Sequence, residues 1–162
     1  MQGPDGSQGL RGALKWLDMP PLWTLLFIAL AWVQASRFPE FTWEHPAFDL
    51  LGGLMVGGGL ILAALAFIQF RRASTTLIPH QEAQALVTSG IYSRSRNPIY
   101  LGDAMIIAGL CAFWGAWPAL VVLMPLFIWL ITDRFILPEE DRLVAAFPEQ
   151  FEAWEKQTRR WI

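Results

Sequence analysis

Apolar residues come in long blocks along the chain, and polar or proline-containing segments separate four such blocks. A spanning helix needs about 20 apolar residues, because the hydrocarbon layer of a bilayer is about 30 Å thick. The pattern therefore predicts an all-α fold, an integral membrane helical bundle with about four transmembrane helices and a C-terminal amphipathic helix. We place the spans at residues 19–36, 49–70, 99–114 and 118–136.

The first block allows two interpretations. Residues 1–18 carry four glycines and scattered charges, which predicts an N-terminal tail. Pro20-Pro21 then opens an apolar run that ends near Ala35 and is short for a span. A signal peptide is the alternative, because basic residues precede this run and small residues lie at its end. We adopt the retained span, which leaves residues 19–162 as a single membrane domain.

The later spans carry signals of close packing. Small residues let membrane helices approach one another, so the glycines of the second span predict a helix contact there. The short turn 115–118 makes the third and fourth spans a helical hairpin, and Pro125 is a candidate kink in the fourth. The glycines concerned are Gly52, Gly53, Gly57, Gly58 and Gly59.

The C-terminal region has a different period. Acidic residues from Glu139 onward suit a helix N-terminus. Apolar side chains then recur three or four positions apart, which predicts an amphipathic helix over residues 139–158 that lies on the membrane or on the protein's own cytosolic face. The apolar stripe consists of Leu143, Phe147, Phe151 and Trp154.

Composition supports the bilayer as the solvent. Hydrophobic residues make up 54% of the 162 residues and charged residues only 16%, and the mean hydropathy is +0.37. The net charge of −2 comes without any basic run, so we expect no nucleic acid as a partner. The single cysteine, Cys111, lies in an apolar block and is interpreted as a packing residue.

The cations predict the orientation. With four spans and a cytosolic N-terminus, every Lys and Arg except Arg37 lies on the cytosolic side, as the positive-inside rule requires. Both termini and the polar segment before the third span are then cytosolic. Because a hairpin brings its two ends together, this segment and Glu139-Glu140 are expected to share a cytosolic pocket.

The polar segment at residues 86–103 is the candidate site. Each polar group next to a membrane must find a hydrogen-bond partner, so a segment with many polar groups is costly to place there. Such a segment therefore indicates a functional site. The chain shows no Ser/His/Asp set, metal spacing or phosphate loop, so this pocket suits binding of a cofactor that supplies the chemistry itself. Its expected lining comprises Tyr92, Arg94, Arg96, Asn97, Tyr100, Asp103, Asp133, Arg134, Glu139 and Glu140.

These residues carry a family resemblance. The segment Leu-Val-Thr-Ser-Gly-Ile-Tyr-x-x-x-Arg-Asn-Pro-Ile-Tyr-Leu-Gly at 86–102, the distant Glu139-Glu140 and the aromatic tail that ends in Arg160-Trp161 are similar to the isoprenylcysteine carboxyl methyltransferase and phospholipid methyltransferase superfamily of integral membrane enzymes. The resemblance covers residues 75–162. It implies an S-adenosyl-L-methionine-dependent methyltransferase, with its cofactor motif at 75–102, acting on an apolar or lipid-like acceptor through a carboxyl, thiol or amine.

The resemblance also implies roles for individual residues. Arg134 would anchor the substrate, and Glu139, with Glu140 beside it, would hold the cofactor's amino group. Asn97 stands where eukaryotic members have His. Tyr100 and Asp103 share one helix face and join Arg134 as catalytic candidates. The implied cofactor-binding residues are Gln84, Leu86, Val87, Tyr92, Asn97, Pro98, Ile99, Tyr100, Gly102, Glu139 and Glu140.

Each of these residues also has a simpler interpretation. Glu139 and Glu140 could only complement a helix N-terminus, Arg94 and Arg96 could only set the topology, and Arg134 could only pair with Asp133. Asp103 could only form an ion pair, yet a carboxylate inside a span is by default a functional candidate.

Two other functions compete with the methyltransferase. A run of four residues, Tyr100 to Asp103, also resembles membrane sterol reductases, which use a nicotinamide cofactor. A non-catalytic membrane scaffold is the other alternative, suggested by the glycine-rich second span. The oligomeric state stays open, with a homodimer through that glycine face as one option.

Overall fold

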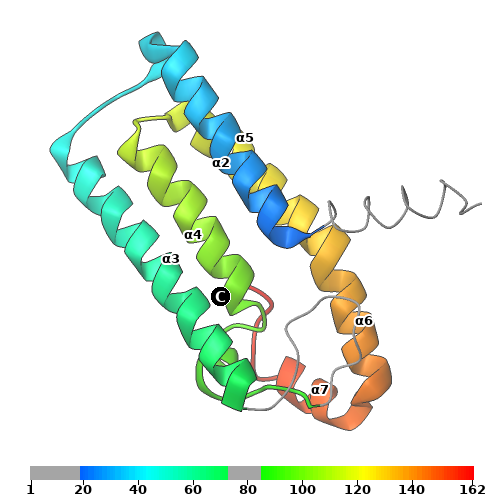
Figure 1. Ribbon diagram of the computed structural model, residues 1–162. Helices are drawn as coiled ribbons and strands as arrows, with labels where there is room; N and C mark the ends of the chain where they lie inside the picture. Colours follow the sequence, from blue (N-terminus) through cyan, green and yellow to red (C-terminus); the bar gives the residue numbers. More distant parts are fainter. Residues whose placement is uncertain (1–18, 73–84) are drawn as a thin grey trace, which may run out of the picture.

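Four long helices run side by side and account for most of the described chain (Figure 1). The structure is a computed structural model that describes residues 19–72 and 85–162. The helices are α2 (Pro20–Arg37), α3 (Pro46–Arg72), α4 (Pro98–Phe113) and α5 (Trp117–Ile131). No strand occurs in the described residues, which confirms the predicted all-α class.

Among the described residues, two helical stretches are long and apolar enough to cross a membrane. They are α3, with 27 residues, and the continuous stretch Trp117–Ala146, with 30 residues. The apolar helix α4 has 16 residues, about 24 Å at 1.5 Å per residue, which is shorter than a typical hydrocarbon layer. The membrane helical fold is thus supported, and the count of about four spans stays a prediction.

Prolines mark where the helices begin. α2, α4, α5 and two further helices, α6 (Leu137–Ala146) and α7 (Pro148–Glu155), each have Pro at one of their first two positions. Proline is tolerated there because the first N–H groups of a helix have no intrahelical acceptor. Two 3-10 turns, η1 (Pro39–Phe41) and η2 (Gly90–Ser93), complete the connections.

Glycines bring α3 and α4 into close contact, as the sequence predicts. A Cβ atom on Gly59 would lie 2.5 Å from the Gly102 carbonyl oxygen, and one on Gly52 would lie 2.5 Å from that of Gly109. The predicted role therefore holds for Gly52 and Gly59. Gly53 has no neighbouring atom within 4 Å of such a Cβ and lies outside this contact.

The C-terminal region differs from the predicted single helix over 139–158. The chain continues from α5 through a π-helical turn, η3 (Thr132–Ile136), directly into α6. The helix then breaks at Phe147, whose backbone has φ −138° and ψ 57°, and α7 begins at Pro148. The break follows from proline, which disfavours helical backbone in the residue before it.

Apolar side chains form two clusters. The first lies within the bundle and includes the T-shaped contact of Phe27 with Phe127, at 5.2 Å between ring centroids. The second joins α3 and α7 to the polar segment through Ala66, Tyr92 and Phe151. The apolar stripe of the C-terminal region therefore packs on the protein itself, and α7 is held against the candidate site.

Candidate functional site

The polar segment begins with a turn that requires glycine. Gly90 has φ +62° and starts η2, and a Cβ atom there would collide with the Gln69 side chain at the end of α3. L-residues with a side chain rarely adopt this backbone conformation, whereas glycine does so at little cost. The turn directs Tyr92 inward, where its ring packs on Phe70 with 5.4 Å between centroids. Tyr92 is thereby buried.

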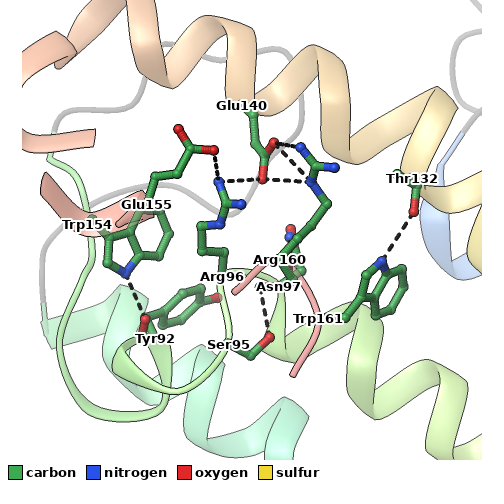
Figure 2. A network of polar contacts seen from close by, with 10 residues as sticks. All are labelled: Tyr92, Ser95, Arg96, Asn97, Thr132, Glu140, Trp154, Glu155, Arg160 and Trp161. Carbon is green, nitrogen blue, oxygen red and sulfur yellow. Dashed lines mark hydrogen bonds and ion pairs between the residues drawn. The ribbon is translucent and has the colours of Figure 1, made fainter. Parts of the chain in front are cut away.

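The last residues of the chain bind back onto this segment. Trp154 donates from Nε1 to the Tyr92 carbonyl at 2.9 Å (Figure 2). The Arg96 backbone N–H donates to the Arg159 carbonyl at 3.0 Å, and Asn97 Nδ2 donates to the Arg160 carbonyl at 3.0 Å. Asn97, predicted to bind the cofactor, therefore holds the C-terminal segment in place.

Glu140 is the centre of an ion network (Figure 2). Its carboxylate lies 3.1 Å from Arg96 Nη1 and 2.6 Å from Arg160 Nη2. Arg96 also reaches Glu155 at 3.0 Å, and the Arg96 and Glu140 side chains are only 8% and 12% exposed. Such charge-assisted pairs fix geometry, because each guanidinium offers several donors in a rigid plane. The negative charge of Glu140 is thus compensated within the protein.

Glu139, one position earlier, has different surroundings. Within the described chain its carboxylate forms no ion pair or hydrogen bond. Its charge acts on both buried phenols, Tyr92 and Tyr100. Glu139 belongs to the charged helix α6, which follows the apolar residues of α5 along the chain. Burial raises the pKa of Glu139, and the nearby Arg142 partly opposes that rise.

Tyr92 lies outside the membrane helices, and burial and the charge of Glu139 both affect the pKa of its phenol. Burial is the main cause that raises the pKa of its phenol, and the Glu139 charge adds to the effect. The phenol is therefore neutral and can donate a hydrogen bond.

Asp103 and Tyr100 lie next to one another on α4. Tyr100 is 9% exposed and belongs to the bundle core. The Asp103 carboxylate accepts a hydrogen bond of 3.1 Å from the Thr24 hydroxyl on α2. The ion pair considered as the simpler interpretation of Asp103 is absent from the described residues.

The remaining predicted residues are distributed around this centre. Leu86, Val87 and Ile99 pack in the second apolar cluster, and Pro98 is fully buried at the start of α4. Gly102 faces α3, and the close contact between the two helices leaves no room for a side chain at this position. Arg134 lies in η3 with an exposed side chain. Gln84 lies outside the described residues.

Several contributors escaped the sequence argument. The sequence predicts Arg160 only as part of a family tail and Arg96 only as a member of the pocket lining or a topology signal, whereas the structure shows that both neutralise Glu140. Trp161 donates to the Thr132 hydroxyl at 3.3 Å and so ties the chain end to η3. The sequence does contain a signal for Thr24, because its hydroxyl lies in the apolar first half of α2.

An apolar cavity of about 220 Å³ lies between α3, α4, α5 and the C-terminal residues. Only apolar side chains line it, and three of them are methionines, whose flexible thioethers adapt to ligands of varied shape. The methionines are Met55, Met105 and Met124, and Trp161 and Ile162 form the wall on the C-terminal side.

Comparison with known proteins identifies the family of the chain. A family model described as phospholipid methyltransferase matches residues 48–150, which include most of α3, the polar segment, the hairpin and both glutamates. No curated protein and no solved structure shows a significant match to the chain. Since the matched region covers more than half of the sequence, the chain belongs to the phospholipid methyltransferase family, within the superfamily of membrane methyltransferases that its motifs resemble.

Proposed function

We propose that this protein uses S-adenosyl-L-methionine to methylate a carboxyl, thiol or amine group of an apolar or lipid-like acceptor. The observation that carries the proposal is the contrast between the two adjacent glutamates. Glu140 is neutralised by Arg96 and Arg160, whereas Glu139 forms no ion pair within the described residues, and its charge is felt by Arg142 and by two buried tyrosines. A half-buried carboxylate without an ion pair favours a cationic ligand.

The chemistry of these groups fits the cofactor. S-adenosyl-L-methionine carries an ammonium and a sulfonium and, when bound, supplies the electrophilic methyl group. Glu139 would hold the ammonium by a charge-assisted hydrogen bond. Tyr92 and Tyr100 offer neutral phenols and ring faces in the same region, and aromatic faces attract cations. The remaining task of the protein is alignment and exclusion of water.

An apolar acceptor fits the helical surface. Many large apolar side chains of α2, α3 and α5 are exposed, among them Leu25 at 59%, Leu50 at 66% and Val121 at 71%. In a bilayer these side chains face lipid tails. The apolar cavity of about 220 Å³ adds space for part of a hydrocarbon chain near the bundle interior.

The orientation is part of the proposal. The charged residues of α6 and the ion network lie at one end of the bundle, and the α2–α3 connection lies at the other (Figure 1). The excess of Lys and Arg on the side of α6 favours a cytosolic pocket. The protein would then be a multi-pass membrane enzyme with both termini in the cytosol.

Isothermal titration calorimetry with S-adenosylhomocysteine, which keeps the ammonium, tests the proposal on the purified protein. We expect wild type to bind and Glu139→Gln to bind at least about tenfold more weakly, because a hydrogen bond to a charged group contributes about 1.5–3 kcal/mol. Glu149→Gln is the matched control, since Glu149 is exposed on α7.

Two results would contradict the proposal. Wild type that fails to bind S-adenosylhomocysteine would remove its basis. Binding of a reduced nicotinamide dinucleotide instead would favour the reductase alternative, and binding of neither would favour a scaffold.

A further inference from the structure

Residues 158–162, the end of the chain, form no helix, yet several hydrogen bonds hold them against the protein. We call them the C-terminal strap. The Arg159 and Arg160 carbonyls each accept a hydrogen bond of 3.0 Å from the polar segment, and Thr158 is only 4% exposed. Chain ends are poorly ordered unless such contacts hold them. The strap therefore has a defined position next to the bundle.

Trp161 connects the strap to the bundle. Its Nε1 donates to the Thr132 hydroxyl at 3.3 Å, and its ring packs against the apolar cluster within the bundle (Figure 2). The same residue forms a wall of the apolar cavity between α3, α4 and α5. A hydrogen bond at the edge of an indole restricts the orientation of the ring. Trp161 is therefore a large wall with a fixed orientation.

The cavity suits a hydrocarbon ligand. Its lining is entirely apolar, and its volume is about 220 Å³. An apolar cavity of about 150 Å³ in another protein stays dry and takes up benzene, so this cavity has room for a larger apolar ligand. Ile128 of α5 lines the cavity and is 39% exposed. The cavity thus reaches the apolar helix surface that faces lipid tails in the proposed topology, and a hydrocarbon chain has access to it from the bilayer.

Trp161 differs from its neighbours in the cavity. Among the described residues that line it, Trp161 is the one aromatic side chain. The three methionines of the lining are flexible and adapt to the shape of a ligand. Arg160, directly before Trp161, binds Glu140 at 2.6 Å. The strap therefore contacts both the apolar cavity and the ion network, and its indole is the lining group best suited to set a limit on size.

We propose that Trp161 limits the size of the hydrocarbon group that enters this cavity from the bilayer, and that Thr132 is the positioning residue for its ring. The inference rests on the proposed function, which supplies a reason for an apolar ligand. In wild type, a ligand that fills the cavity meets the indole. A smaller side chain at position 161 would enlarge the cavity toward the strap and admit a longer ligand.

The test measures the binding of n-alkylbenzenes, from toluene to hexylbenzene, to the purified full-length protein in amphipol. Calorimetry gives the affinities, with protein-free amphipol as the blank. For wild type, we expect the affinity to rise about fourfold with each methylene that is buried, and to stop rising at the chain length that reaches Trp161. In Trp161→Ala the rise should continue, so that hexylbenzene binds at least about fourfold more tightly than to wild type.

Three further variants accompany this measurement. Trp161→Leu has an apolar side chain of intermediate size and should give an intermediate limit, which also tests the inference if the alanine variant does not fold. Thr132→Val keeps the cavity but frees the indole, so its affinity for hexylbenzene should lie between those of wild type and Trp161→Ala. Trp129→Ala is the matched control and should keep the wild-type limit, because Trp129 is 63% exposed on α5 and does not line the cavity.

Several outcomes would overturn the inference. Equal limits in wild type and in the Trp161 variants would do so, and so would failure of wild type to bind any alkylbenzene. A wild-type dimer that dissociates when alkylbenzene is added would assign the cavity to a second copy of the chain instead. S-adenosylhomocysteine separates the inference from the proposed function. Wild type that shows the limit set by Trp161 but does not bind S-adenosylhomocysteine would refute the methyltransferase and leave the size limit intact.

Discussion

At the scale of single residues, two adjacent carboxylates at the start of α6 have separate roles. Glu140 forms ion pairs with Arg96 and Arg160, whereas Glu139 is half-buried without an ion pair in the described chain. A fully paired carboxylate stabilises the arrangement of the surrounding segments. An unpaired carboxylate of this kind is suited to bind a ligand.

The first prediction concerns the pH dependence of ligand binding. Burial raises the pKa of Glu139 above the ordinary value for glutamate of about 4.3. Its anionic form is therefore complete only above that raised pKa, and affinity for an ammonium should be lost as the pH falls through it. Calorimetry with S-adenosylhomocysteine from neutral to acidic pH measures this loss. Glu139→Gln should lack it, and the same pH dependence in both proteins would contradict the assignment.

The second prediction concerns the stability of the ion network. Glu140→Gln leaves the buried Arg96 and its neighbour Arg160 without their shared anion, and breaking a buried pair costs about 3–5 kcal/mol. Glu155→Gln is the control, because Glu155 is 49% exposed and an exposed pair contributes about 0–1 kcal/mol. Thermal unfolding in detergent should show a much larger loss for Glu140→Gln. Equal losses would mean that the network does not stabilise the fold.

At the scale of helices, the α3–α4 contact is set by backbone proximity. Gly59 faces the Gly102 carbonyl and Gly52 faces that of Gly109, so two glycine pairs two turns apart hold the helices together. This packing uses van der Waals contact, because lipid surroundings provide no hydrophobic drive between helices. The start of α4, which carries Tyr100 and Asp103, is thereby fixed relative to α3.

The third prediction tests this contact with a matched pair of substitutions. Gly59→Ala places a methyl group 2.5 Å from the Gly102 carbonyl oxygen and should destabilise the protein by about 1–3 kcal/mol, as overpacking does. Gly53→Ala introduces the same methyl group with no atom within 4 Å and should be neutral or slightly stabilising. Thermal unfolding of the two variants measures the difference. A destabilised Gly53→Ala would indicate that this face also makes a contact, such as a homodimer interface.

At the scale of the whole molecule, the bundle has two distinct ends. The connection between α2 and α3 lies at one end, and α6, α7 and the ion network lie at the other (Figure 1). The proposed topology assigns these ends to opposite sides of the membrane. In that proposed topology, the candidate site would take its cofactor from the cytosol and its acceptor from the bilayer.

The fourth prediction tests that topology by thiol labelling. Cys111, the single cysteine of the chain, is buried, so an introduced surface cysteine supplies the accessible thiol. Glu44→Cys and Glu149→Cys place thiols at exposed positions near the two ends. In intact cells an impermeant maleimide should label only Glu44→Cys, and it should label Glu149→Cys only after permeabilisation. The opposite pattern would reverse the orientation.

The sequence alone determined the helical membrane class, the hairpin, the polar segment and the pairing of that segment with Glu139-Glu140. These features depend on local patterns, since apolar blocks, prolines and glycines act on the backbone nearest to them. The break at Phe147 was missed although its cause, Pro148, is equally local, because the apolar stripe continues across it.

Only the tertiary structure decided which glutamate is neutralised, which glycines meet and where Asp103 finds its partner. Thr24 and Asp103 are 79 positions apart, and Asn97 and the Arg160 carbonyl are 63 apart. Such contacts depend on how helices dock and how the chain end returns, and no local period encodes either. Glu139 and Glu140 have the same chemistry in sequence. They differ because α6 presents Glu140 to Arg96 and Arg160, whereas Glu139 forms no ion pair within the described residues.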